Sequence, residues 1–117
     1  ELLTLVLNNL ISNAVKFTPA GGRVAVCVRP AGASAEFSVQ DSGCGMDRKT
    51  VAHIFEKFYQ ADSSRATQGN GLGLALVRRV ADILSLGIRV ESEPGQGSRF
   101  SVTVPLAEIL DSRNPVV

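Results

Sequence analysis

The chain has 117 residues, with twelve lysines and arginines, eleven acidic residues and a formal net charge of +1. This length suits one domain with one hydrophobic core, and the balanced charge provides no overall field that would favour nucleic acid or an anionic membrane. No apolar run approaches the roughly 20 residues of a membrane-spanning helix. Two cysteines are too few for a disulfide framework in a chain of this length, so we expect a reduced, cytoplasmic setting.

The first segment predicts an amphipathic helix over residues 1–17. Asn9, Asn13 and Lys16 lie at i, i+4 and i+7 and therefore share one polar stripe, which Asn8 does not join. A polar stripe is usually a solvated face, but amide oxygens suit Mg²⁺ and a lysine can meet phosphate as a point charge. The apolar residues recur at helical spacing and should form the buried face. They are Leu3, Val6, Leu7, Leu10, Ile11, Ala14 and Phe17.

The next segments predict a β-hairpin, with strands over residues 24–28 and 37–39 and a turn over 30–34. The second strand leads into Asp41-Ser-Gly43-Cys-Gly45. An ordinary turn explains this segment about as well as a ligand site does. In the functional interpretation, the carboxylate accepts a hydrogen bond from the adenine amino group, and the glycines let the base approach the backbone. Guanine would leave acceptors unpaired there, at a cost of about 2 kcal/mol or more, so ATP would be selected over GTP.

The remaining segments complete an α+β pattern. We expect a short helix over 48–54, a polar loop over 60–70 that acts as a lid, and a long helix over 72–84 whose apolar face holds Leu76, Val77, Val80, Ala81 and Leu84. Two further strands, over 88–92 and 99–104, are joined by a Pro-Gly turn. Together these elements predict a two-layer sandwich, in which helices cover one face of a mixed, mostly antiparallel sheet and the other face meets solvent.

A third glycine cluster opens the second long helix. It reads Gly69-Asn-Gly71-Leu-Gly73-Leu74. The unpaired amides of a helix's first turn carry partial positive charge and favour phosphate. The cluster lacks the Gly-Lys-Ser/Thr ending of a Walker loop and the preceding parallel strand of a dinucleotide fold.

Taken together, these motifs resemble the catalytic ATP-binding domain of bacterial sensor histidine kinases, which has a Bergerat-type fold shared with type II topoisomerases, heat-shock chaperones and mismatch-repair ATPases. The resemblance covers about residues 3–106, so we expect a catalytic domain over 1–106 and a tail over 107–117. It also implies that residues ahead of Glu1 are missing and that the sheet has an exposed edge. The matching motifs are the N box from Asn9 to Thr18, the glycine boxes at Asp41–Gly45 and Gly69–Leu74, the F box at Ile54–Phe58, and Gly95-Gln-Gly97-Ser98.

The resemblance implies a role for each matching position. Asn13 would bind Mg²⁺, Asn9 would support the metal, Lys16 would contact phosphate and Asp41 would hold adenine. The topoisomerase and chaperone branches of the superfamily carry a glutamate where this chain has Asn9. An amide cannot serve as the base for water, so a kinase is favoured over an ATPase machine. The remaining nucleotide contacts would come from Phe17, Gly43, Gly45, Arg65, Gly69, Gly71, Leu72, Gly73, Leu74 and Ser98.

The expected reaction is transfer of the γ-phosphoryl of ATP to a histidine on a separate dimerisation domain, with a response regulator further along the pathway. His53 is the only histidine and is expected to be a surface or packing residue, not the acceptor. Phe55 and Phe58 either help to dock the partner domain or pack in the core. Two alternatives remain open: an ATP-binding sensor or scaffold without kinase activity, and a serine kinase of the anti-sigma-factor type, which the absent glutamate disfavours.

Overall fold

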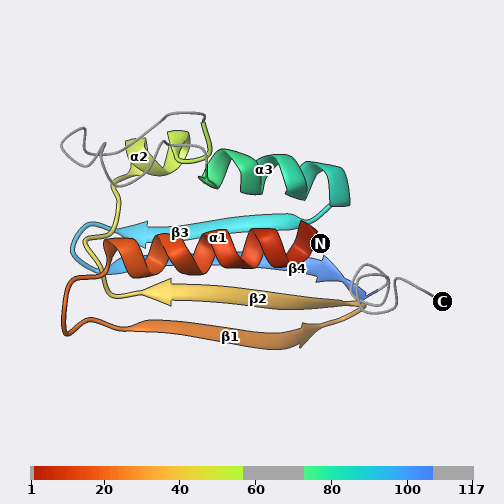
Figure 1. Ribbon diagram of the computed structural model, residues 1–117, viewed down its shortest axis with the longest axis horizontal. Coiled ribbons are helices and arrows are strands. Elements are labelled where there is room, and N and C mark those ends of the chain that lie inside the picture. The colour runs from red at the N-terminus through yellow and green to blue at the C-terminus, as the bar shows by residue number, and fades with distance from the viewer. Residues whose placement is uncertain (1, 57–72, 107–117) are drawn as a thin grey trace.

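The computed structural model describes residues 2–56 and 73–106. It contains one sheet of four strands in the order β1-β2-β4-β3, and all three pairings are antiparallel. The helices lie on one face of this sheet, and α1 and α3 contact each other as well as the strands beneath them (Figure 1). The two-layer α+β prediction is therefore confirmed, and the described strands are antiparallel throughout rather than mixed.

The core lies between the two long helices and the sheet. Helix α1, Leu2–Phe17, buries Leu3, Val6, Leu10 and Ala14, which fall on one face as the sequence predicted. Truncating a fully buried leucine such as Leu10 to alanine removes about 2–5 kcal/mol of stability, because the cavity fills only partly. The other core side chains come from β2, α3 and β4 and from Leu86, which lies between α3 and β3. They are Val39, Val77, Val80, Ala81, Leu86, Phe100, Val102 and Val104.

Helix α3, Gly73–Leu84, packs through a narrower stripe than expected. Val77, Val80 and Ala81 are buried, but Leu76 is 40% exposed, so its assignment to the packed face was wrong. One residue corresponds to about 100° around a helix, which turns Leu76 away from the sheet when Val77 faces it.

The hairpin turn is shorter than predicted. Strand β1, Val24–Ala31, and strand β2, Ser34–Asp41, leave only Gly32 and Ala33 to connect them, and Gly32 has φ +66°. The expected turn over 30–34 was wrong because Pro30 continues β1 opposite Ala35. A proline is tolerated there because β1 is an edge strand of the described sheet, where an N–H can be absent without breaking a ladder.

The other strands place one end of the sheet beside the start of the short helix. Strand β3, Gly87–Glu93, and strand β4, Gly97–Pro105, are joined by a turn that follows Glu93. Helix α2, Arg48–His53, begins after Asp47, whose side chain accepts a hydrogen bond from the Thr50 N–H at 2.8 Å. This bond, made to the charged form, lowers the pKa of the Asp47 carboxyl below its usual value.

The face of the sheet away from the helices is polar. Glu36 on β2 is buried beneath two arginines, with Arg29 Nε 2.8 Å from Oε1 and Arg89 Nη2 3.4 Å from Oε2. Both arginines are largely exposed, so each pair contributes about 0–1 kcal/mol. Among the described residues, no helix is both long and apolar enough to cross a membrane.

Candidate nucleotide-binding site

Asp41 is held at the end of β2 on the helix-covered face of the sheet. It follows Val39 by two residues and therefore points to the same side as that core valine. The side chain is 8% exposed, and Oδ1 accepts a hydrogen bond from the Gly43 N–H at 2.8 Å. Oδ2 makes no hydrogen bond to another residue in the part of the chain that the structure describes. The fixed carboxylate thus keeps one acceptor oxygen for a ligand.

Gly43 brings the loop after β2 against the end of α1. A Cβ atom on this residue would overlap the backbone carbonyl oxygen of Phe17 and would lie 3.0 Å from Asp41 Oδ1. Glycine is therefore required here by the close approach of the α1 backbone, a reason different from the predicted approach of a base. The contact places the predicted adenine carboxylate at the same end of the molecule as the Lys16–Phe17 end of the N box.

The second glycine box meets α1 where Gly73 lies beside Asn9. Its Nδ2 donates to the Leu5 carbonyl oxygen at 2.9 Å, so the amide oxygen points away from its own helix backbone. That Oδ1 lies 3.2 Å from the position that a Cβ atom on Gly73 would occupy. Gly73 is the first residue of α3. The start of α3, whose amides favour anions, therefore lies directly beside the N box.

The rest of the N-box stripe is available to a ligand. Asn13 is half-buried and Lys16 is exposed, and neither makes a side-chain hydrogen bond or ion pair to another residue within 2–56 and 73–106. Asn8, which the spacing placed outside the stripe, is exposed. These residues suit Mg²⁺-ATP. Neutral amide oxygens can bind the metal, and a lysine and a helix start can bind the phosphates. No group of three His, Cys, Asp or Glu side chains competes for a metal within the described ranges.

Several predicted contacts are not tested by this geometry. Leu74 packs partly against the core, which gives it a structural role. Arg65, Gly69, Gly71 and Leu72, the loop over 60–70, Phe58 and the tail over 107–117 lie outside the described residues.

The turn between β3 and β4 packs against the loop over residues 41–46. A Cβ atom on Gly97 would overlap the Asp41 carbonyl oxygen, and one on Gly45 would overlap that of Glu93. The Gly95 N–H donates to the Cys44 carbonyl oxygen at 2.7 Å. The glycine pattern at 95–97 signalled this turn, but nothing in the sequence indicated its contact with residues 41–45.

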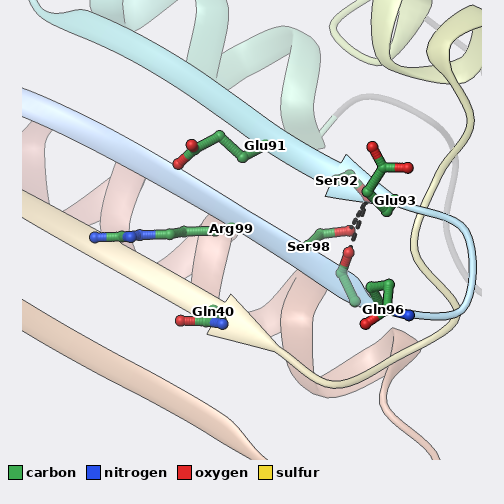
Figure 2. Close-up of a pocket in the computed structure, with 8 residues that line it drawn as sticks. Gln40, Glu91, Ser92, Glu93, Gln96, Ser98 and Arg99 are labelled. Carbon is green, nitrogen blue, oxygen red and sulfur yellow. Dashed lines mark hydrogen bonds between the residues drawn. The ribbon is translucent and has the colours of Figure 1, made fainter.

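Ser92 is a second feature that the sequence did not reveal. Its Oγ accepts from the Met46 N–H at 2.7 Å. The same oxygen lies 3.0 Å from the Gly97 carbonyl oxygen and 2.9 Å from Ser98 Oγ (Figure 2). Ser98 lies opposite Asp41 in the β2–β4 register. The serine that the sequence singled out therefore belongs to a hydrogen-bonded cluster beside Asp41.

His53 and Phe55 have the structural roles that were among the predictions for them. His53 Nδ1 lies 2.6 Å from Glu56 Oε2 on the exposed surface, which suits a surface residue. The Phe55 ring meets the Phe100 ring edge to face, with centroids 6.3 Å apart. This contact supports core packing for Phe55.

A hollow of about 260 Å³ lies at the β3–β4 turn. Figure 2 shows Gln40, Arg99 and Glu91 side by side on β2, β4 and β3, with Ser92 and Ser98 nearby. Its lining contains none of the polar residues on α1. The Asp41 side chain also lies outside this lining.

The comparisons with known proteins agree with this fold. The family model described as "Histidine kinase-, DNA gyrase B-, and HSP90-like ATPase" matches residues 1–108. The chain belongs to this family. Its place within the family is indicated by relatives that are named sensor histidine kinases.

Two curated relatives illustrate the similarity. The sensor-like histidine kinase SenX3 of Mycobacterium tuberculosis is 43% identical over 106 residues, which make up 89% of this chain and 26% of that protein. The circadian input-output histidine kinase CikA of Synechococcus elongatus is 41% identical over 115 residues, 97% of this chain and 15% of that protein. The chain thus spans about a quarter or less of the length of these relatives.

Solved structures show the same architecture. The mycobacterial sensor histidine kinase MprB superimposes with a TM-score of 0.80 at 30% identity, over 89% of this chain and 72% of that one. Full-length ShkA, solved in complex with AMPPNP, superimposes with a TM-score of 0.77 at 38% identity, over 89% of this chain and 21% of that one. This domain therefore has the fold of histidine kinase catalytic domains.

Proposed function

We propose that this chain is the catalytic domain of a sensor histidine kinase, which binds Mg²⁺-ATP and transfers its γ-phosphoryl group to a histidine on a dimerisation domain of the same parent protein. The observation that carries the proposal is the meeting of the three motif segments. Asp41 and Gly43 lie against the end of α1, and Gly73 lies against Asn9 in its middle. This arrangement offers a base site beside Phe17 at the end of α1, and an anion-binding helix start beside Asn9.

At the base site, Asp41 Oδ2 would accept a hydrogen bond from the adenine amino group while Oδ1 remains bound to the Gly43 N–H. Gly43 and Gly45 would shape the pocket, and Phe17 would lie beside the ring. Because a carboxylate only accepts hydrogen bonds, the guanine carbonyl oxygen would face it without a donor. The site should therefore prefer ATP to GTP.

At the phosphate site, Asn13 would bind Mg²⁺ with support from Asn9, Lys16 would neutralise phosphate charge, and the α3 start would donate amides. The metal would neutralise charge that develops on the phosphoryl oxygens. We propose further contacts from Arg65, Gly69, Gly71, Leu72, Leu74 and Ser98. Position 9 is an amide and not a carboxylate, so no base is present there for water, and the γ-phosphoryl would be kept for the partner's histidine.

The partner would be a histidine-bearing dimerisation domain, and a response regulator would receive the phosphoryl group from it. We propose that the domain works in the cytoplasm. Among the described residues His53 already pairs with Glu56, and it is not proposed as the acceptor.

Calorimetric titration with ATP and GTP, each with and without Mg²⁺, tests the site. Mg²⁺-dependent binding of ATP, with GTP bound at least tenfold more weakly, is expected. Labelled phosphate from ATP should then appear on a supplied histidine domain of a close relative, and not on its His→Ala variant. Binding without transfer would favour the scaffold alternative, and absence of binding by the folded chain would contradict the proposal.

A further inference from the structure

The Ser92 hydroxyl has its full complement of hydrogen bonds. Its one proton can go to the Gly97 carbonyl oxygen at 3.0 Å, and its oxygen accepts from the Met46 N–H at 2.7 Å. The 2.9 Å contact with Ser98 Oγ then has Ser98 as donor. One donor and two lone pairs are thereby used, and a hydroxyl can make no more strong bonds than these.

These bonds join β3, which holds Ser92, to two other pieces of backbone, the end of the glycine loop and the start of β4. Met46 follows Gly45 at the end of the glycine loop, Gly97 begins β4, and Ser98 lies opposite Asp41 in the sheet. Gly97 also lies against the Asp41 carbonyl oxygen, so a shift of the β3–β4 turn must move the Asp41 backbone. Ser92 thus holds the far end of the loop, while the β2–β4 ladder holds its near end.

A second bond strengthens this connection. The Gly95 N–H donates to the Cys44 carbonyl oxygen at 2.7 Å, within the same loop. The loop over 41–46 is therefore fixed at its start by the sheet, in its middle by Gly95 and at its end by Ser92. A carboxylate that must meet a base within hydrogen-bonding distance depends on such fixing, since small displacements remove the bond.

We infer that Ser92 is a positioning residue for base recognition: through Met46 and Gly97 it fixes the loop that presents Asp41 to adenine. The inference rests on the proposed function. Ser92 itself need not touch the nucleotide, and it sets the ATP preference by keeping the Asp41 oxygen in place.

The test compares Ser92→Ala with Ser92→Thr, which keeps the hydroxyl, in the whole chain. Ser101→Ala is the matched control, because Ser101 is also a buried serine of the same sheet but lies on the open face, without a hydrogen-bond partner in residues 2–56 and 73–106. Affinities for ATP and GTP are measured by titration and by displacement of ATP. The exchange rate of the Met46 amide proton is followed by NMR, and thermal melting is recorded for each variant.

We expect Ser92→Ala to bind ATP about tenfold more weakly, with GTP affinity unchanged and Met46 exchange accelerated at least tenfold. Ser92→Thr should recover most of the ATP affinity, and Ser101→Ala should bind like the wild type. If Ser92→Ala does not fold, Ser92→Cys replaces it, since a thiol of similar size forms only weak hydrogen bonds.

Three results would overturn the inference: wild-type ATP affinity in Ser92→Ala, equal losses for ATP and GTP, or the same loss in Ser101→Ala. Each of them leaves the proposed function standing if the wild-type chain binds Mg²⁺-ATP. A wild-type chain that is folded but binds no ATP removes the proposed function and the inference together.

Discussion

On the helix-covered face of the sheet, the buried polar side chains beside the candidate site are hydrogen-bonded, whereas on the open face one is not. Asp41 binds the Gly43 N–H and Ser98 binds Ser92. On the opposite face Ser101 is 2% exposed, and among the described residues its hydroxyl has no hydrogen-bond partner. The first region is fixed by directional bonds and close backbone contacts, while the second is covered by long side chains such as Arg89, which reaches across β4 to Glu36. Substitutions should therefore have opposite effects in the two regions.

The largest expected effect is at the backbone contact behind Asp41. Gly97→Ala combines φ +88° with a Cβ atom that would overlap the Asp41 carbonyl oxygen. We expect a loss of about 3 kcal/mol or more in the free energy of unfolding, from left-handed strain and overpacking together. Gly95→Ala in the same turn has φ +79° but open space around the new atom, so it should lose only about 1–2 kcal/mol. Urea unfolding measures both, and equal losses would show that the close contact is unimportant.

Asp41→Asn should have the next largest effect, on nucleotide affinity. An asparagine has one accepting oxygen and one donating nitrogen, but the position faces the Gly43 N–H on one side and, in the proposed complex, the adenine amino group on the other. Whichever way the amide turns, two donors face each other. We expect ATP affinity to fall by about 2–3 kcal/mol, or roughly 30–150-fold, in a calorimetric titration. Unchanged ATP affinity would place adenine elsewhere.

Asn13→Ala sharpens the assignment of the phosphate end. We expect the Mg²⁺-dependent part of ATP binding to weaken by about tenfold, while binding measured without Mg²⁺ changes little. Asn8→Ala is the matched control, since Asn8 is an exposed asparagine of the same helix outside the polar stripe. Titrations with and without Mg²⁺ give the ratio for each variant. An equal change in the two variants would count against a metal-binding role for Asn13.

The sequence was sufficient for those features that depend on periodicity or on a local backbone requirement. The buried face of α1 and the antiparallel hairpins follow from such patterns, and the structure confirms them. It also predicted that Asp41 would end its strand. Asn9 meets Gly73 because α1 packs on α3. The sequence suggested this contact only through the family resemblance.

The errors and omissions have a common cause in tertiary context. Pro30 looked like a turn residue, yet it lies in β1 because an edge strand does not need its N–H. Leu76 looked like a core residue, but its helix faces the sheet through Val77, Val80 and Ala81. Ser92 carried no signal at all, because its importance comes from Met46, which is 46 residues distant in the chain. A single side chain's partners across a sheet cannot be predicted from its neighbours in sequence.

The smallest expected effect is on the open face of the sheet, where a substitution should raise stability rather than lower it. Ser101→Ala removes a buried hydroxyl that makes no hydrogen bond, so the protein should gain about 1 kcal/mol of stability, or about 4 °C in Tm. Ser98→Ala removes a hydrogen-bonded hydroxyl beside Asp41 and should lose about 1 kcal/mol. Thermal melting monitored by circular dichroism compares the two variants directly. Destabilisation by both would mean that the Ser101 hydroxyl has a partner, such as a bound water, and that the two faces of the sheet satisfy their buried polar groups alike.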